Sequence, residues 1–200
     1  GADIAVDKRI PLGAGLGGGS SDAATVLVAL NALWNTGLPR GRLAEIGLSL
    51  GADVPVFVQG RNAWAEGVGE RLTPLELPPR WYVILDPQVH VSTAELFQAP
   101  ELTRNAAPAT IAGFLSGEIA DNAFEPVVRA RFPQVAAALD WLGRFGIARL
   151  SGSGGAVFLE CEGVARAREI ATRCPAEFTA VVARGLDISP LDRALARYQN

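Results

Sequence analysis

The sequence PLGAGLGGGSSDAA, from Pro11 to Ala24, places five glycines between positions 13 and 19, directly before an apolar stretch. Glycine has no Cβ, so a glycine-rich backbone approaches other groups closely and adopts positive φ angles that other residues avoid. Residues 20–34 carry few polar side chains and are expected to form a nearly buried helix. The first N–H groups of a helix lack intrahelical partners and carry partial positive charge. The pattern therefore predicts a phosphate-binding loop at a helix N-terminus.

The common phosphate-binding patterns fit this loop poorly. A P-loop ends in Gly-Lys-Ser/Thr, whereas the only lysine of the chain, Lys8, precedes the loop. The dinucleotide pattern G-x-G-x-x-G matches Gly13, Gly15 and Gly18, but no strand runs directly into it and no acidic residue follows about twenty positions on. A flexible linker is not normally followed by so apolar a helix. These exclusions favour phosphate binding of a third kind.

Composition restricts the partners of this chain. The 200 residues carry a net charge of −3, which argues against a nucleic-acid or anionic-membrane partner. No apolar run reaches the roughly twenty residues of a membrane span. Cys161 and Cys174 fit reduced thiols in a cytoplasm better than a disulfide framework. No feature of the sequence indicates an oligomeric state.

The hydrophobic periodicity predicts an α+β chain with two domains, 1–76 and 77–200, separated by a proline-rich stretch. In the first domain we expect a strand at 2–7, helices at 20–34 and 40–50, and strands at 56–58 and 62–66 that turn at Gln59-Gly60.

The second domain alternates strands and helices in a recognisable order. We expect strands at 81–85, 148–150, 156–160 and 179–183, and helices at 122–131, 134–145 and 164–173. This order is typical of a ferredoxin-like sandwich, with helices on one face of an antiparallel sheet. The segment 99–117 has no clear period and is expected to be loop with a short helix.

The glycine loop and the segments that follow it carry a family resemblance. A proline followed by G-x-G-L-G-x-x-S-S-x-A at the mouth of a buried helix resembles the nucleotide loop of the GHMP kinase superfamily. Within it, the chain resembles the 4-diphosphocytidyl-2-C-methyl-erythritol kinases over essentially its whole length, most specifically in the first two of the later segments. These segments are LGADVPVF (50–57), AEGVGERLTPL (65–75), NAFEPVV (122–128), RLSGSGGAVF (149–158) and SPLDRAL (189–195).

The resemblance implies a GHMP kinase fold, with part of a ribosomal-protein-like N-terminal ATP-binding domain and a ferredoxin-like C-terminal domain. It implies transfer of the ATP γ-phosphoryl group to the tertiary 2-hydroxyl of a cytidine diphosphate-linked methylerythritol, in the non-mevalonate isoprenoid pathway, with ATP and Mg²⁺. The family's N-terminal lysine, asparagine and Tyr-His pair have no counterpart here. We therefore expect a fragment that is inactive by itself.

Two alternatives remain. One is another small-molecule kinase of the superfamily, acting on homoserine or mevalonate, against which AEGVGE and NAFEP argue. The other is a non-catalytic sensor or RNA-binding module. The acidic balance disfavours RNA, and the presence of Asp53 disfavours an inactive sensor.

The resemblance implies that Asp53 of the GADVP motif is the catalytic residue. It would orient the acceptor hydroxyl and take its proton late, because a carboxylate is too weak a base to remove that proton early. The residues alone favour a turn residue at the end of a helix, since Asp53 follows Gly51 and Pro55 favours an extended Val54. No metal-ligating residue is expected.

The same resemblance implies two binding sets, and each has a plainer alternative. Ser20 and Ser21 could cap the helix, residues 151–155 could form a tight hairpin, and Phe97 could belong to the core. His90 fits an exposed loop residue. The expected ATP-binding residues are Pro11, Leu12, Gly13, Ala14, Gly15, Leu16, Gly17, Gly18, Gly19, Ser20 and Ser21, and the expected substrate-binding residues are Phe97, Gly152, Ser153 and Gly154.

Overall fold

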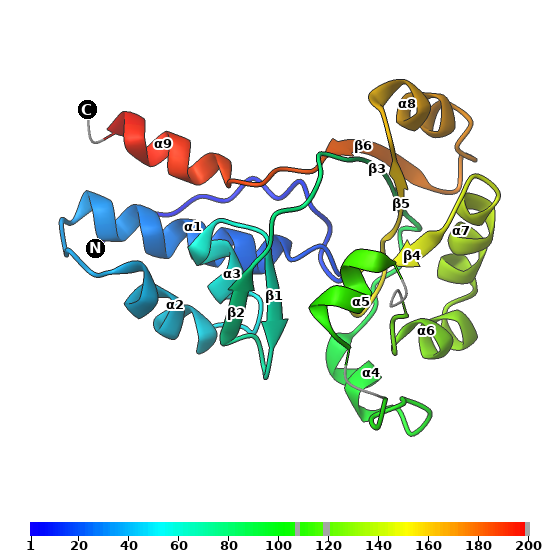
Figure 1. Ribbon diagram of the computed structural model, residues 1–200, viewed down its shortest axis with the longest axis horizontal. Helices are drawn as coiled ribbons and strands as arrows, with labels where there is room; N and C mark the ends of the chain where they lie inside the picture. Colours follow the sequence, from blue (N-terminus) through cyan, green and yellow to red (C-terminus); the bar gives the residue numbers. More distant parts are fainter. Residues whose placement is uncertain (107–108, 118–120, 199–200) are drawn as a thin grey trace. The chain divides into compact units, whose positions relative to one another are not determined.

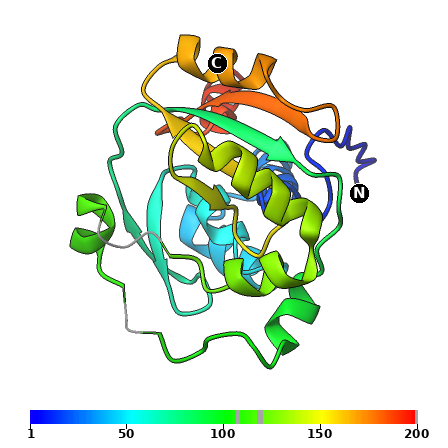
Figure 2. The same ribbon diagram turned by 90° about the vertical axis from the view of Figure 1, so that its right-hand side faces the viewer.

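The computed structural model describes residues 1–106, 109–117 and 121–198, and its packing divides the chain into two compact units (Figures 1 and 2). The first unit comprises Gly1–Arg9, Gly17–Pro79 and Leu186–Asn200. The second comprises Ile10–Leu16 and Arg80–Gly185.

These two packing units are not two consecutive stretches of the chain, as the expected domains 1–76 and 77–200 are. The unit changes at Pro79, close to the expected boundary at 76/77, but the C-terminal segment groups with the first unit. The reason is that Leu191 and Leu195 pack against the core of the first unit. The assignment of functional domains to 1–76 and 77–200 stays a prediction.

The first unit combines helices with a β-hairpin (Figure 1). Its buried core consists of Ala24, Val28, Leu43, Val54 and Val58. The helices are α1 (Gly18–Leu33), α2 (Arg40–Leu48), α3 (Val54–Gln59) and α9 (Pro190–Tyr198), and the antiparallel hairpin pairs β1 (Ala63–Glu66) with β2 (Arg71–Pro74).

Two expected strands of the first unit are wrong. Residues 1–9, all of them described, form no strand, and Ile4 and Val6 expose about half of their surface (56% and 51%). A strand needs a hydrogen-bonded neighbour, and the apolar alternation at 2–7 does not by itself supply one. The strand expected at 56–58 is helix α3, with Val54 helical and Pro55 in its first turn. Proline is tolerated there because its missing N–H would have no intrahelical partner.

The second unit is a ferredoxin-like sandwich, as its order of elements predicts. Its antiparallel sheet has the strand order β4-β5-β3-β6. Val83 and Leu85 of the central strand are fully buried, whereas Tyr82 and Ile84 alternate with them and are only partly buried. The strands are β3 (Trp81–Asp86), β4 (Ala148–Leu150), β5 (Val157–Cys161) and β6 (Thr179–Arg184).

Helices of the second unit cover one face of this sheet (Figure 2). Apolar side chains of these helices, apart from the short helix at 111–116, form one core with the buried strand residues. A short helix does occur within 99–117, although positions 107–108 of that segment lie outside the described residues. The helices are α4 (Thr93–Gln98), α5 (Ile111–Ser116), α6 (Glu125–Arg131), α7 (Pro133–Gly143) and α8 (Val164–Thr172). Within the described ranges, no helix is long and apolar enough to cross a membrane.

Candidate active site

Every second residue of the glycine loop, from Gly13 to Gly17, has a positive φ angle. Gly13, Gly15 and Gly17 have φ angles of +73°, +71° and +66°, whereas Ala14 and Leu16 between them do not have positive φ. Positive-φ residues that alternate with right-handed helical residues would turn successive N–H groups toward one side and make a concave anion site. The geometry therefore suits the phosphate-binding prediction, and explains the glycine at every second position.

In the first unit, the loop continues into α1 without a side-chain cap. Gly17 is the N-cap residue and makes no side-chain capping bond, so neither Ser20 nor Ser21 caps the helix. The first turn holds no acidic residue, and a Cβ at Gly19 would meet nothing within 4 Å. Since the first N–H groups of a helix have no intrahelical acceptor, this end is open and electropositive.

The segment that carries Asp53 packs against this same end of α1. Ser20 Oγ lies 3.7 Å from the position that a Cβ would take at Gly51, and the Phe57 ring lies 2.8 Å from the Cβ position at Gly17. Asp53 directly precedes α3, is exposed, and makes no hydrogen bond or ion pair with any described residue. The structure thus places the segment that carries Asp53 beside the start of α1.

The AEGVGE motif shapes the backbone next to Asp53. Gly69 has φ +112°, and a Cβ there would lie 2.1 Å from the carbonyl oxygen of Ala52. The Glu70 carboxylate accepts a hydrogen bond from the N–H of Val68 at 2.7 Å. The N–H groups of Glu70 itself and of Val68 hold the pKa of Glu70 below its usual value. The hairpin turn therefore fits closely against the residue that precedes Asp53, and glycine is required at the contact.

In the second unit, the two glycine loops lie backbone against backbone. The N–H of Ala156 donates to the carbonyl of Ala14, and Ser151 Oγ donates to the carbonyl of Gly15, both at 2.9 Å. A Cβ at Gly15 would lie 2.0 Å from Ser151 O. Residues 151–155 therefore do more than join β4 to β5, because they support the first glycine loop at a distance that only glycine permits.

His90 also contacts the glycine loop, which the sequence did not indicate. Its Nδ1 lies 3.3 Å from the carbonyl oxygen of Leu12, and a Cβ at Gly13 would lie 2.3 Å from the same nitrogen. His90 is an exposed loop residue, as expected, but its ring covers the start of the loop. The 78 residues that separate it from Leu12 leave no local signal for this contact.

The expected substrate-binding residues gather around α4. Thr93 Oγ1 lies 2.5 Å from Ser153 Oγ, which joins the first residue of α4 to the second glycine loop. Phe97 follows Thr93 by four positions and so lies on the same side of the helix. Its side chain is 59% exposed and meets Phe124 edge to face, with 5.0 Å between ring centroids. Phe97 is therefore not a core residue.

The NAFEPVV motif anchors the second glycine loop. Asn122 Nδ2 donates to the carbonyl oxygens of Gly152 (2.7 Å) and Leu150 (3.2 Å), and its Oδ1 accepts from the N–H of Phe124 (2.9 Å). One amide thus connects the loop at 151–155 to the start of α6. This gives the motif a structural role.

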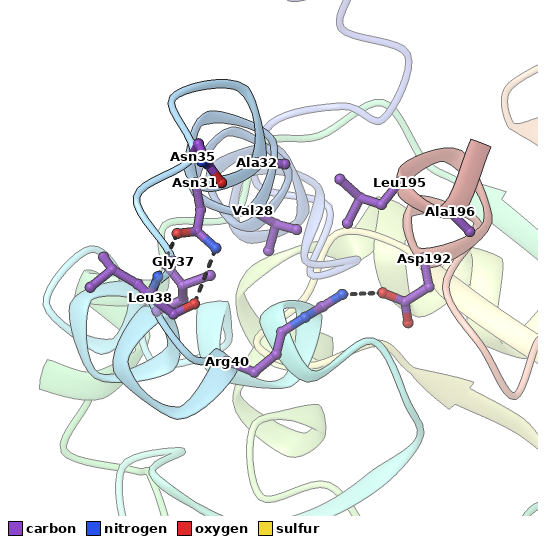
Figure 3. Close-up of a pocket in the computed structure, with 11 residues that line it drawn as sticks. Val28, Asn31, Ala32, Asn35, Gly37, Leu38, Arg40, Asp192, Leu195 and Ala196 are labelled. Carbon is purple, nitrogen blue, oxygen red and sulfur yellow. Dashed lines mark hydrogen bonds and ion pairs between the residues drawn. The ribbon is translucent and has the colours of Figure 1, made fainter. Parts of the chain in front are cut away.

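A pocket of about 400 Å³ lies elsewhere in the first unit (Figure 3). It is lined from α1, α2 and α9, and neither Asp53 nor the glycine loop contributes to it. Three of its polar side chains already have partners, because Asn31 bonds the backbone of Leu38 and Arg40 pairs with Asp192. Nothing in its lining suggests a phosphate. Over the described part of the chain, no group of three or more His, Cys, Asp or Glu residues could hold a metal ion.

Comparison with known proteins agrees with this architecture. The family "GHMP kinases N terminal domain" matches residues 1–61, and "GHMP kinases C terminal" matches residues 100–180. A 4-diphosphocytidyl-2-C-methyl-D-erythritol kinase from Xanthomonas campestris pv. campestris (strain B100) is 58% identical over 199 residues, covering 100% of this chain and 68% of the relative. The enzyme of that name from Halorhodospira halophila is 55% identical, covering 98% of this chain and 69% of the relative.

Solved structures show the same likeness. A crystal structure of 4-(cytidine 5'-diphospho)-2C-methyl-D-erythritol kinase matches with a TM-score of 0.73 and 38% identity, covering 89% of this chain and 68% of that one. A homoserine kinase from Cytophaga hutchinsonii matches with a TM-score of 0.58 and 15% identity, covering 91% of this chain and 69% of that one, which shows a shared fold alone. By fold, motifs and identity to its relatives, the chain belongs to the 4-diphosphocytidyl-2-C-methyl-D-erythritol kinase family of GHMP kinases.

Proposed function

We propose that the protein transfers the γ-phosphoryl group of ATP to the 2-hydroxyl of 4-diphosphocytidyl-2-C-methyl-D-erythritol, in the non-mevalonate isoprenoid pathway. The family of its relatives supports the substrate and the reaction class. The observation that carries the chemistry is the exposed carboxylate of Asp53, which has no partner among the described residues and lies on a segment packed against the electropositive start of α1.

ATP is proposed to bind through its phosphates to residues 11–21. The alternating φ angles of the loop and the uncapped first turn of α1 supply N–H donors without any lysine in the loop. Phosphoryl transfer depends mainly on positioning and on charge neutralisation, which such donors provide. The hydroxyls of Ser20 and Ser21 are also available, because neither serine caps the helix.

Asp53 is proposed as the catalytic residue. It would accept a hydrogen bond from the acceptor hydroxyl, orient the attacking oxygen, and take the proton as the new P–O bond forms. A carboxylate already engaged in an ion pair would be poorly suited to this role. Asp53 has no such partner among the described residues.

The residues at this site suit Mg²⁺, which we propose as the second cofactor. Magnesium prefers oxygen ligands and is commonly held by one or two carboxylates together with substrate phosphates. The hydroxyls of Ser20 and Ser21 are oxygen donors at the start of α1, and using them leaves the Asp53 carboxylate for the acceptor hydroxyl. When bound, the ion would neutralise charge on the transferring phosphoryl group.

The cytidine part of the acceptor is proposed to bind in the second unit. Phe97 presents an exposed aromatic face, and Gly152, Ser153 and Gly154 lie on the loop joined to α4 through Thr93. A pyrimidine base would stack on such a ring. We also propose a cytoplasmic location, with which the free thiols of Cys161 and Cys174 are compatible.

Another kinase of the superfamily is the second candidate, but nothing specific favours it. The likeness to homoserine kinase rests on 15% identity and concerns the fold alone. The AEGVGE and NAFEP segments have defined structural roles next to Asp53 and the second glycine loop.

Replacement of Asp53 by asparagine in the full-length protein tests the proposed function. We expect kcat with the cytidine-bearing alcohol to fall by about two to four orders of magnitude, the range typical of a lost general base. KM for ATP should stay within about twofold, since the carboxylate faces the acceptor. The assay is ADP release coupled to NADH oxidation. Asp187→Asn is the matched control, because within the described ranges the partner of this surface aspartate is Asn62. If Asp53→Asn turns over nearly as fast as the wild type, the catalytic role of Asp53 is refuted and the residue only forms a turn.

A further inference from the structure

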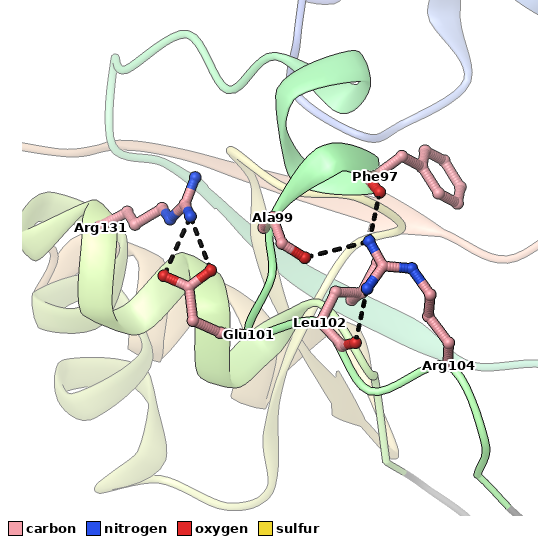
Figure 4. A network of polar contacts seen from close by, with 6 residues as sticks. All are labelled: Phe97, Ala99, Glu101, Leu102, Arg104 and Arg131. Atoms are coloured by element: carbon pink, nitrogen blue, oxygen red, sulfur yellow. Dashed lines mark hydrogen bonds and ion pairs between the residues drawn. The ribbon is translucent and has the colours of Figure 1, made fainter.

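Arg104 clamps the C-terminal end of α4 (Figure 4). Its guanidinium group donates to the carbonyl oxygens of Phe97 at 2.7 Å, Ala99 at 3.0 Å and Leu102 at 3.2 Å. One side chain therefore bonds the backbone of Phe97 itself and of two residues that follow it.

Such a clamp matters because α4 has only six residues. A helix this short is not stable by itself, and its last carbonyl groups have no intrahelical donors. The N-terminal end is held by Ser92, whose Oγ accepts from the N–H of Glu95 at 3.4 Å. The C-terminal end carries Phe97, and here a planar cation with several donors bonds the carbonyl of Phe97 and adds to the bond that the carbonyl of Ala99 accepts from the N–H of Leu102.

The Phe97 ring depends on this backbone support more than its neighbours do. Leu96 and Ala99 are each only 1% exposed and are held by the core, whereas Phe97 is 59% exposed. The Phe97 and Phe124 rings meet edge to face. A ring presented at the surface on a rigid backbone loses little freedom when a flat ligand stacks on it, so rigidity there raises affinity.

An ion pair fixes the segment that carries the clamp. Glu101 accepts two hydrogen bonds from Arg131, at 3.0 and 2.7 Å (Figure 4). Arg131 is the last residue of α6, and Phe124 directly precedes the first. The segment at 99–104 is therefore tied to the same helix whose start meets the Phe97 ring.

We propose that Arg104 is a positioning residue that sets the affinity for the cytidine part of the acceptor by holding Phe97 in place. This inference rests on the proposed function, in which Phe97 stacks on the base. Arg104 acts through the backbone of Phe97 and touches neither ATP nor the reacting atoms in this assignment. It is therefore expected to influence binding of the cytidine group rather than the phosphoryl transfer itself.

The test compares Arg104→Ala, Arg104→Lys, Phe97→Leu and the double variant Arg104→Ala/Phe97→Leu in the full-length protein. Calorimetry measures affinity for cytidine 5'-diphosphate, and the coupled assay measures kcat and both KM values. We expect Phe97→Leu to weaken cytidine diphosphate binding about tenfold, as lost stacking does. Arg104→Ala should weaken it about five- to tenfold, with kcat and KM for ATP within about twofold.

Two further results distinguish positioning from general support. The double variant should bind no more weakly than Phe97→Leu, because Arg104 acts only through that ring. Arg104→Lys should lie between the wild type and Arg104→Ala, because one ammonium cannot bond three carbonyls as the guanidinium does. Arg166→Ala is the control, since Arg166 pairs with Glu169 on the surface of α8.

Several outcomes would overturn the proposal. If Phe97→Leu weakens binding and Arg104→Ala does not, the inference about Arg104 fails while the stacking role of Phe97 stands. Additive losses in the double variant would also refute it, as would equal losses of kcat, ATP affinity and cytidine diphosphate affinity. If Phe97→Leu leaves binding unchanged, the proposed cytidine contact fails and the inference fails with it. The Asp53→Asn experiment remains a separate test of the phosphoryl transfer.

Discussion

Replacing Gly17 by alanine, with Gly37→Ala as the control, should separate the backbone strain of a left-handed residue from the steric contact with Phe57 at the start of α1. Gly17 has φ +66°, so any other residue there meets backbone strain, and its Cβ would lie 2.8 Å from the Phe57 ring. Gly37 is a matched control from the same unit. It has the same φ of +66°, but a Cβ there would meet nothing within 4 Å. Strain is thus common to both variants, and the contact with Phe57 is specific to Gly17→Ala.

The expected magnitudes follow from these contacts. Left-handed backbone costs a non-glycine residue about 1–2 kcal/mol, which both variants should lose in the free energy of unfolding. Ordinary van der Waals contact begins at 3.4 Å, so the Phe57 ring must yield by several tenths of an ångström. Overpacking of this kind costs about 1–3 kcal/mol, and the far edge of a ring yields more easily than backbone does. Gly17→Ala should therefore be about 1–2 kcal/mol less stable than Gly37→Ala.

The functional consequence should also be confined to Gly17. A shift of the first turn of α1 misplaces N–H donors proposed to bind the ATP phosphates, and a hydrogen bond to a charged group contributes about 1.5–3 kcal/mol. Each tenfold change in affinity corresponds to about 1.4 kcal/mol, so Gly17→Ala should weaken ATP binding by about ten- to a hundredfold, and Gly17→Val should weaken it by more.

Urea unfolding and calorimetry with ATP measure both effects in the full-length protein. Gly37→Ala should lose stability but keep its ATP affinity, since Gly37 lies beyond the far end of α1. Equal ATP affinities of the two variants, with both folds intact, would refute the assignment of this helix end to the nucleotide. Equal stabilities would refute the steric argument.

Two further predictions concern side-chain pairs outside the site. Asp192→Ala should lower the free energy of unfolding by about 1–2 kcal/mol, because Arg40, which also donates to Val58 O, loses its charged partner. Glu45→Ala is the control and removes an exposed ion pair with Arg42. It should change the free energy of unfolding by less than about 0.5 kcal/mol in the same urea titration. The hydrogen bonds from Arg131 hold the pKa of Glu101 below its usual 4.5. The stabilisation from that pair should be complete above pH 4.5 and lost as the pH falls through the lowered value. Urea titrations from pH 7 to about pH 3 should show the difference between the wild type and Glu101→Gln disappear on the acid side, and a constant difference would contradict the shift.

Local patterns were sufficient to predict much of the second unit. The hydrophobic residues of its strands and helices recur with clear periods, and the expected order of elements predicted the ferredoxin-like sheet that the structure shows. A helix near 20–34 was equally clear, because the run of apolar residues is too long for a strand. Each of these predictions depends on residues within a short window.

Short apolar runs could not be assigned in the same way. The run at 56–58 suits a strand or a buried helix, and its burial between α1 and α2 decides for helix α3. The alternation at 2–7 predicts a strand, yet a strand exists only where another backbone bonds it. Both errors arise because pairing and burial are properties of distant residues.

The sequence by itself determined the glycine loop, the helix that follows it and the family of the chain, because glycine spacing and motif identity can be recognised without a fold. Only the tertiary structure decided which groups meet. It put Ser20 beside Gly51, Gly69 against Ala52, and His90 on the glycine loop. These contacts join residues far apart in the chain, and their close distances depend on packing that no local pattern encodes.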